Sequence, residues 1–140
     1  MRNGRIEKMQ SDWVKGITPI NDEVVEWAQK TGEQLALKRL TPSTIRRFFG
    51  EMRRIQSNFK EYHSDVPLLK AKLAYDVGRK YDKRSKKGEG VYLFFEVLSP
   101  GISAVGDEEL ETQKENFDRF VKLSEALVAF HKLYYKGKDD

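Results

Sequence analysis

Four arginines in one short stretch have the residue type and spacing for binding phosphate. In "LTPSTIRRFFGEMRRIQSNF", residues 40–59, two adjacent arginine pairs recur seven positions apart: Arg46, Arg47, Arg53 and Arg54. The planar guanidinium grips phosphate oxygens through two hydrogen bonds at once. Solvated helix faces usually mix charges of both signs, whereas the single acid beside these arginines is Glu51. The stretch alone leaves two alternatives open, a solvated face and an anion-binding face.

The pattern of this stretch predicts a helix that begins at Thr41 and runs to about Tyr62. Thr41 is a good N-cap, and Pro42 suits the first helical position, where its missing N–H costs nothing. At about 100° per residue, six apolar residues from Ile45 to Phe59 fall on one face and the arginines fall on the other as two columns.

A second basic segment follows, with aromatic residues inserted among the cations. Tyr75 and Tyr81 alternate with cations that follow a phosphate backbone well: Lys70, Lys72, Arg79, Lys80, Lys83, Arg84, Lys86 and Lys87. A tyrosine ring can stack on a nucleic-acid base, although helical tyrosines more often pack in a core. The segment therefore favours nucleic-acid binding through its cations more than through its rings.

The charge distribution along the chain points the same way. Residues 38–87 hold fifteen Lys/Arg and five Asp/Glu, a net charge of +10. Residues 1–37 carry five basic and six acidic side chains (−1), and residues 88–140 carry six and eleven (−5), which gives +4 overall. A basic middle third between acidic flanks indicates a nucleic-acid partner.

The sequence offers little for catalysis, and we expect no enzyme, cofactor or metal site. The chain has no cysteine, no phosphate-binding glycine loop and only two histidines, His63 and His131. Asp107 and Glu108 open a predicted helix, where acids favour the helix dipole. His131 lies on an apolar face, as expected for a hydrogen-bonded core histidine.

The apolar periodicity predicts an all-α, single-domain bundle of about four to five helices. Residues 1–20 are expected to be poorly ordered or late to dock, and residues 21–140 to form the helical domain that binds nucleic acid. The expected helices begin near Asp22, at Pro42, after Asp65 as a cap, at residue 91 in "VYLFFEVL", and near Asp107. "SPG" at 99–101 should break the fourth. No apolar run is long enough for a membrane span, which favours a cytoplasmic protein.

The last predicted helix has an apolar band that looks wider than a small core can cover. It runs from Leu110 to Tyr135 and includes Phe117 and Phe120. An uncovered band of that size would be a large exposed patch. We therefore expect part of it, Phe117 and Phe120 first, to pack against another chain, with self-association in the free protein.

Three motifs in order resemble the small helical subunit of type III-A CRISPR effector complexes, the Csm complex. "LTPSTIRRFF" (40–49) is similar to the family's "LTTSQIRKFF", with Thr44 in place of glutamine. "LLKAKLAYDVGR" (68–79) is similar to "LKPKLAYxxGR", with Ala71 in place of proline. "RFVKLSEALVAFHK" (119–132) is similar to "EAIVAYHK", with Phe130 in place of tyrosine. The likeness spans roughly residues 24–135.

The resemblance implies a non-catalytic subunit that lies along the guide RNA–target RNA duplex, beside the repeating backbone subunit and the large signalling subunit, in antiviral defence. By position in the motifs, the RNA-contacting residues would be Arg46, Lys70, Lys72 and Arg79, with Tyr75 beside them. Arg47, Arg53 and Arg54 join this set by helical geometry. Because base pairing reads sequence in an RNA-guided machine, phosphate and shape contacts suffice for the protein.

The alternative is a DNA-binding helix-turn-helix. "GEQLALKRLTPSTIRRFF" can be read as helix, turn and recognition helix, with Ser43, Thr44, Arg46 and Arg47 entering a groove. Against it, the apolar stripe continues to Phe59, which is longer than a recognition helix requires.

Overall fold

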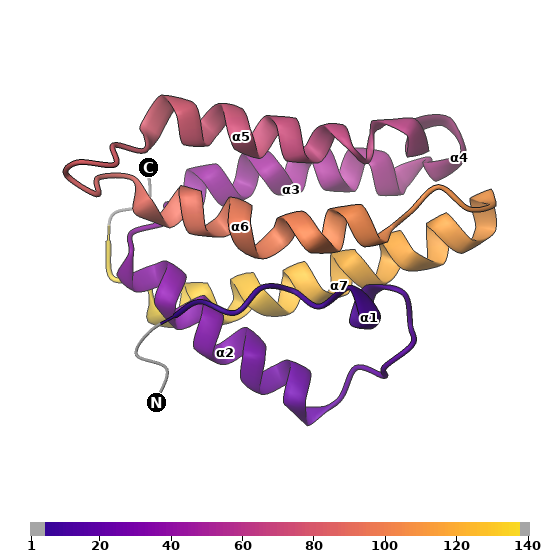
Figure 1. The fold of residues 1–140 in the computed structure, drawn as a ribbon, viewed down its shortest axis with the longest axis horizontal. Coiled ribbons are helices and arrows are strands. Elements are labelled where there is room, and N and C mark those ends of the chain that lie inside the picture. The colour runs from indigo at the N-terminus through magenta and orange to yellow at the C-terminus, as the bar shows by residue number, and fades with distance from the viewer. Residues whose placement is uncertain (1–4, 138–140) are drawn as a thin grey trace.

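The computed structural model describes residues 5–137, and these form an all-helical domain (Figure 1). The all-α prediction is confirmed, and no strand occurs between residues 5 and 137. In chain order the elements are α1 (Ser11–Val14), α2 (Asp22–Leu37), α3 (Pro42–Ser57), α4 (Phe59–Tyr62), the 3-10 turn η1 (His63–Asp65), α5 (Leu68–Lys80), α6 (Glu89–Ala104) and α7 (Leu110–Tyr134). The described chain thus has seven α-helices, so the predicted four to five is wrong. Both α1 and α4 are single turns, too short to show a helical period.

Asn58 explains why the predicted helix 42–62 is two helices. Thr41 caps the start of α3 as predicted, its hydroxyl accepting the backbone N–H of Thr44 at 3.4 Å. Asn58 leaves the helical region (φ −151°, ψ 75°), and its side-chain oxygen accepts the N–H of Glu61 at 3.4 Å. Asparagine competes well for local backbone groups in this way. The chain therefore ends α3 and restarts α4 at this residue.

Two predicted helix boundaries are wrong. Asp65 does not cap α5, since it lies in η1 and its carboxylate accepts a hydrogen bond from Arg54 at 2.8 Å. "SPG" does not end α6, which continues through Pro100 to Ala104. Proline costs a helix one hydrogen bond. Here Leu98 and Ile102 are buried on either side of Pro100, so packing of that apolar face holds the helix together.

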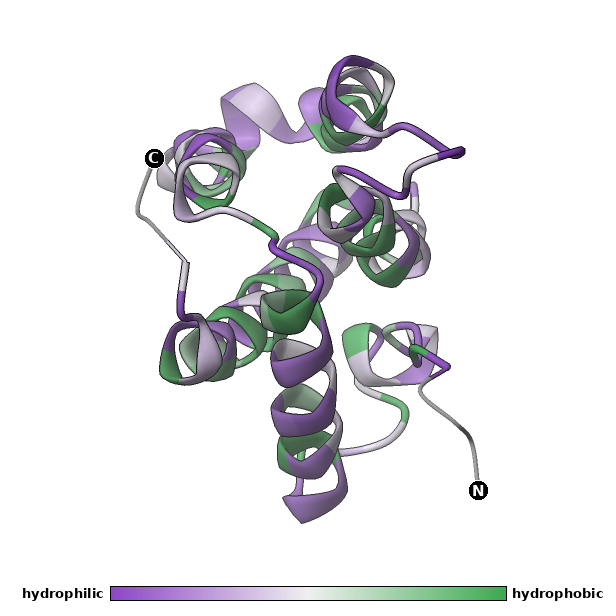
Figure 2. Ribbon diagram, turned by 90° about the vertical axis from the view of Figure 1, so that its left-hand side faces the viewer, coloured by the Kyte–Doolittle hydropathy of each residue, from purple (hydrophilic) through white to green (hydrophobic). Residues whose placement is uncertain are grey.

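The helices form two sides with α6 and α7 between them. In Figure 1, α3 and α5 lie together on one side of the bundle, and α1 and α2 lie on the other. Figure 2 shows apolar helix faces turned inward and hydrophilic faces outward. Fully buried aromatic side chains, Phe94, Phe117 and Phe120, occupy the core. The basic middle third of the sequence thus builds one side of the molecule.

The structure describes residues 5–20 of the segment expected to be poorly ordered or late to dock, residues 1–20; its Met9, Trp13 and Val14 are buried in the core, while Ile17 and Ile20 are exposed. The Met9 N–H donates to the Val97 carbonyl at 3.0 Å, and Met9 is 1% exposed. Trp13, 2% exposed, lies with its ring centroid 5.1 Å from that of Trp27. Trp27 Nε1 donates to the Glu7 carbonyl at 2.8 Å. Residues 1–4 lie outside the described residues.

The apolar band of α7 is covered by its own chain. Phe117 and Phe120 are fully buried, so the expectation that they face another chain is wrong. The cover comes from α1, α2, α3 and α6, all of which contact α7. Gly32 lets α2 approach α7 closely, because a Cβ on it would lie 2.8 Å from the backbone nitrogen of His131 and the backbone carbonyl of Leu127. The sequence analysis did not assign residues 1–20 to the core, so it underestimated how much of α7 the chain itself can cover.

Candidate nucleic-acid interface

A groove between α3 and α5 collects half of the predicted RNA-binding residues. It encloses about 760 Å³. Phe48 and Leu73 are its buried apolar lining. The predicted residues that line it are Arg47, Lys72, Tyr75 and Arg79. All four are exposed, and Tyr75 retains 68% of its surface. The two helices that carry the first and second motifs therefore present cations and one ring along a single groove.

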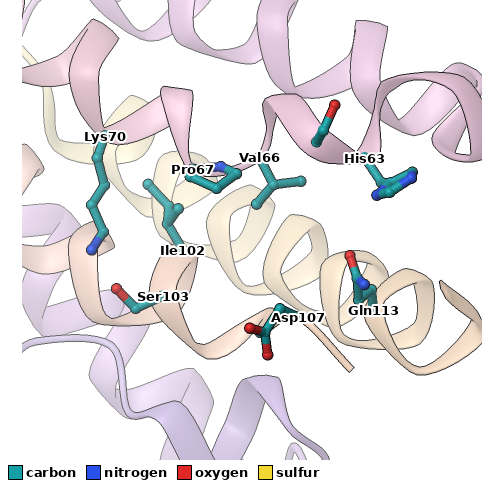
Figure 3. A pocket seen from close by; sticks show the side chains of 10 residues that line it. His63, Val66, Pro67, Lys70, Ile102, Ser103, Asp107 and Gln113 are labelled. Carbon is teal, nitrogen blue, oxygen red and sulfur yellow. The ribbon is translucent and has the colours of Figure 1, made fainter. Parts of the chain in front are cut away.

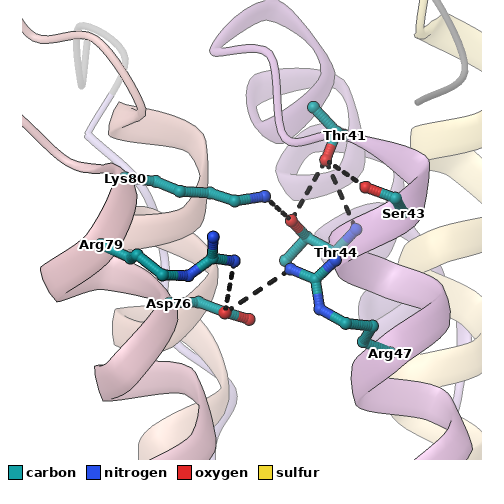
Figure 4. Close-up of polar contacts among 7 residues, drawn as sticks. All are labelled: Thr41, Ser43, Thr44, Arg47, Asp76, Arg79 and Lys80. Atoms are coloured by element: carbon teal, nitrogen blue, oxygen red, sulfur yellow. Dashed lines mark hydrogen bonds and ion pairs between the residues drawn. The ribbon is translucent and has the colours of Figure 1, made fainter.

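Asp76 lies between two of these cations and binds both (Figure 4). Its Oδ1 is 3.5 Å from an Nη2 of Arg47 and 3.5 Å from the Nη2 of Arg79. The Asp76 side chain is only 14% exposed, whereas each arginine is 49% exposed. One shielded carboxylate thus holds a guanidinium from each wall of the groove, and the cluster keeps one net positive charge.

A second polar contact ties the two helices together at one end of the groove. Lys80 Nζ donates to the Thr44 hydroxyl at 2.9 Å, and that hydroxyl also lies 3.1 Å from Thr41 Oγ1 (Figure 4). Thr44 is 1% exposed. The sequence predicted only that Lys80 belongs to a basic segment. No sequence signal pairs it with a threonine 36 positions away.

Two further arginines of α3, Arg53 and Arg54, are also paired with acids. Arg53 binds Glu125 of α7 at 2.8 Å. Arg54 binds Asp65 at 2.8 Å and Glu51 at 3.3 Å, and Lys72 Nζ lies 3.9 Å from the same Glu51. The hydrogen bond to Asp65 raises the pKa of the Arg54 guanidinium, with partial desolvation opposing it. Besides Glu51 of α3 itself, the acids that pair with these arginines come from η1 and α7, so the sequence of α3 alone did not reveal them.

The structure separates the predicted residues onto three parts of the surface. Arg53 pairs with Glu125 of α7, and Arg46 lies seven positions before it in the same column of α3. Arg47 and Arg54, in the other column, pair with Asp76 of α5 and Asp65 of η1. Lys70 lines a different pocket of about 650 Å³ between η1, the start of α5 and the α6–α7 connection. Figure 3 shows Lys70 near Ser103 at one end of this pocket and His63 near Gln113 at the other. A single flat basic face is therefore not what the fold builds.

His131 is a hydrogen-bonded core residue, as predicted. It is 2% exposed, its Nε2 lies 2.7 Å from the Leu40 carbonyl, and its ring stacks on Tyr135 with centroids 5.0 Å apart. Burial lowers the pKa of the imidazole, and the backbone hydrogen bond to Leu40 works against that shift. Because Leu40 offers a carbonyl acceptor, Nε2 carries the proton of the neutral ring.

The described residues contain neither a metal-binding cluster nor a membrane-spanning helix. Among residues 5–137, no three His, Asp or Glu side chains come together in a way that would hold a metal ion. Within the same residues, each helix falls short of the length and apolar character that crossing a bilayer requires.

An all-α domain whose α3 and α5 carry the basic motifs has the features of a small subunit of a CRISPR effector. Comparison with protein-family models matches residues 19–137 to Csm2 Type III-A. The chain belongs to this family and is a small subunit of the type III-A Csm complex. Searches of curated proteins and of solved structures found no match.

Proposed function

We propose that this Csm subunit binds the backbone of the guide RNA–target RNA duplex through the groove between α3 and α5. The observation that carries the proposal is the convergence of Arg47, Lys72, Tyr75 and Arg79 on that groove. Cations at the rim suit phosphate, and the exposed Tyr75 ring offers a flat apolar surface to a sugar or base. An A-form duplex presents its wide minor groove and 2′-hydroxyls to such a surface.

The proposed role is non-catalytic and cytoplasmic, in antiviral defence, with the repeating backbone subunit and the large signalling subunit as protein partners. The groove holds cations, a phenol and shielded carboxylates that are already paired. A nuclease would need a base and a nucleophile aimed at one reacting phosphorus. Positioning of RNA is the chemistry these groups support.

The helix-turn-helix alternative loses one of its reading residues in this structure. Thr44 is 1% exposed and its hydroxyl contacts Thr41 and Lys80, so it does not reach a base edge. Arg47 pairs with Asp76 on α5, whereas a recognition helix needs such a side chain free to enter a groove of the DNA. Because Thr44 is buried and Arg47 is held by Asp76, we favour the RNA assignment.

Self-association stays a proposal, and it needs residues other than those predicted. With Phe117 and Phe120 buried, the large apolar side chains that α7 leaves exposed are Leu110 (37%) and Leu133 (63%). Light-scattering mass at several concentrations tests the idea. A mass that grows with concentration and falls in Leu133→Lys supports it, and a constant monomer mass ends it.

The test of RNA binding is charge reversal in the groove against an equal reversal elsewhere. Arg47→Glu with Arg79→Glu changes four charge units at the groove. Lys15→Glu with Lys30→Glu makes the same change on the α1–α2 side of the bundle, far from it (Figure 1). Binding to an RNA duplex is followed by fluorescence anisotropy across a salt series, because phosphate contacts release counterions.

The groove variant should lose at least about tenfold in affinity and flatten the salt dependence, while the control should lose much less. Circular dichroism should show both folded. Equal losses in the two variants would mean that only net charge matters. Unchanged binding in the groove variant would remove the groove from the function.

A further inference from the structure

The loop between α5 and α6, residues 81–88, is the most concentrated basic feature of the surface. It projects beyond the ends of both helices (Figure 1). Four of its eight residues are exposed cations, and they fall within five positions: Lys83, Arg84, Lys86 and Lys87. Asp82 is the one acid, so the loop carries a net charge of +3. None of its cations is in the predicted RNA-binding set.

Asp82 organises this loop through its own backbone and side chain. Its N–H donates to the Lys87 carbonyl at 2.8 Å, and its carbonyl accepts from the Lys86 N–H at 2.7 Å. Oδ1 accepts the Arg84 N–H at 3.0 Å, and Oδ2 accepts the Ser85 hydroxyl at 3.1 Å. The carboxylate is therefore occupied by a backbone amide and a hydroxyl instead of a cationic head group.

The base of the loop is fixed as well. Tyr81 and Tyr92 stack with ring centroids 4.9 Å apart and planes 11° from parallel. Gly88 has φ +78°, and a Cβ on it would overlap the Lys80 carbonyl, so only glycine fits this turn into α6. The loop is thus a preordered projection with its cations held apart from the helices.

The loop cations and the helix cations differ in their partners. Arg47, Arg53, Arg54 and Arg79 each lie within 3.5 Å of a carboxylate. Within residues 5–137, the side chains of the four loop cations make no ion pair and no hydrogen bond. The carboxylate beside a paired arginine offsets part of its charge, which weakens its attraction for phosphate by up to about fivefold in affinity per pair. When an unpaired cation binds a phosphate, it displaces counterions from the nucleic acid and has no carboxylate partner to offset its charge.

We infer that the α5–α6 loop is a phosphate-binding element that supplies most of the electrostatic attraction for RNA. It takes the phosphodiester backbone of an RNA strand or duplex beside the groove, without reading bases. This inference rests on the proposed RNA-binding function. It assigns the salt-dependent part of that binding to Lys83, Arg84, Lys86 and Lys87.

The test compares two fourfold neutralisations that remove equal charge. The loop variant replaces Lys83, Arg84, Lys86 and Lys87 by glutamine. The helix variant replaces Arg47, Arg53, Arg54 and Arg79 by glutamine. Full-length protein is titrated into a fluorescent RNA duplex at several salt concentrations. The logarithmic salt slope of the loop variant should fall by about 3, from four lost phosphate contacts, and its affinity by at least about tenfold.

The helix variant should lose less than half of that slope. A loop variant with the wild-type slope, beside a helix variant that has lost it, would overturn the loop assignment and leave the proposed function standing. Wild-type protein without measurable RNA binding would remove both. An equal decrease of the salt slope in the two variants would also overturn the inference, because the ion pairs of the helix arginines would then make no difference to RNA binding.

A second pair of variants tests whether the order of the loop matters. Asp82→Ala and Glu61→Ala each remove one exposed negative charge, so electrostatics alone predicts tighter RNA binding for both. Because Asp82 holds the loop in shape, Asp82→Ala should bind more weakly than Glu61→Ala by a few-fold. Equal or tighter binding by Asp82→Ala would overturn the claim that a preordered loop is used.

Discussion

Trp13→Ala is the sharpest test of how the N-terminal segment contributes to the fold. Trp13 is 2% exposed and stacks at an angle on Trp27, whose indole nitrogen is bonded to Glu7 in the same segment. Truncating a buried tryptophan to alanine costs about 3–5 kcal/mol of unfolding free energy. Since domains have about 5–15 kcal/mol in total, the variant should fold but with much of its stability gone.

Urea denaturation followed by circular dichroism measures this loss. With an m-value of about 2 kcal/mol/M, a loss of about 4 kcal/mol lowers the urea midpoint by about 2 M. Ile17→Ala is the control, because Ile17 belongs to the same segment and is 68% exposed. Its unfolding free energy should stay within about 0.5 kcal/mol of wild type. A Trp13→Ala loss below about 1 kcal/mol would refute the packing argument.

The same variant tests whether the segment docks late in folding, as the sequence predicts. If Trp13 packs only after the folding transition state, nearly the whole loss appears in the unfolding rate. A loss of about 4 kcal/mol then speeds unfolding by about 10³-fold and leaves the folding rate almost unchanged. A slower folding rate would instead place Trp13 in the folding nucleus.

Three further predictions concern the core. The pKa of His131 is lowered in the folded state, so the unfolded chain binds more protons. The contribution of neutral His131 to stability should be complete above about pH 6.5 and should fall as the pH drops below it. Thermal melts of His131→Gln should show a flatter dependence on pH. Gly32→Ala should lower the melting temperature, because its Cβ would lie 2.8 Å from the backbone of α7. Gly50→Ala, whose Cβ would have no atom within 4 Å, should raise the unfolding free energy by about 1 kcal/mol. A Gly32→Ala protein more stable than Gly50→Ala would refute the close approach of α2 and α7. Phe117→Asp should unfold the chain, and a folded monomer by circular dichroism would contradict its burial in the core.

Local signals predicted the helix boundaries that depend on local chemistry. Thr41 and Pro42 mark the start of α3, because capping uses atoms three residues apart. Helicity of "VYLFFEVL" was also predicted correctly, as part of α6. Pro100 misled the prediction because its penalty is local, whereas the burial of Leu98 and Ile102 that offsets it comes from distant helices.

The N-terminal segment and the ion pairs were out of reach of sequence patterns for a different reason. Met9 and Trp13 lie in a loop and a single turn, which have no period to detect. The partners of Arg53 and Arg54 are 72 and 11 positions away, so only the folded chain reveals that these cations are paired. A count of basic residues gives net charge but not the number of cations free to bind phosphate.

Under the proposed RNA-binding function, paired and unpaired cations would have different roles. Arg47, Arg79 and Asp76 carry a net charge of +1 in a fixed arrangement across the groove, whereas the α5–α6 loop carries +3 on side chains that face solvent. Charges of the second kind act over about 10 Å at moderate salt and steer encounter. Charges of the first kind are partly offset by Asp76 and held in place by it, so they would act at contact and favour one docking geometry. A protein that follows a duplex without reading bases needs both, because attraction alone would leave its register on the RNA undefined.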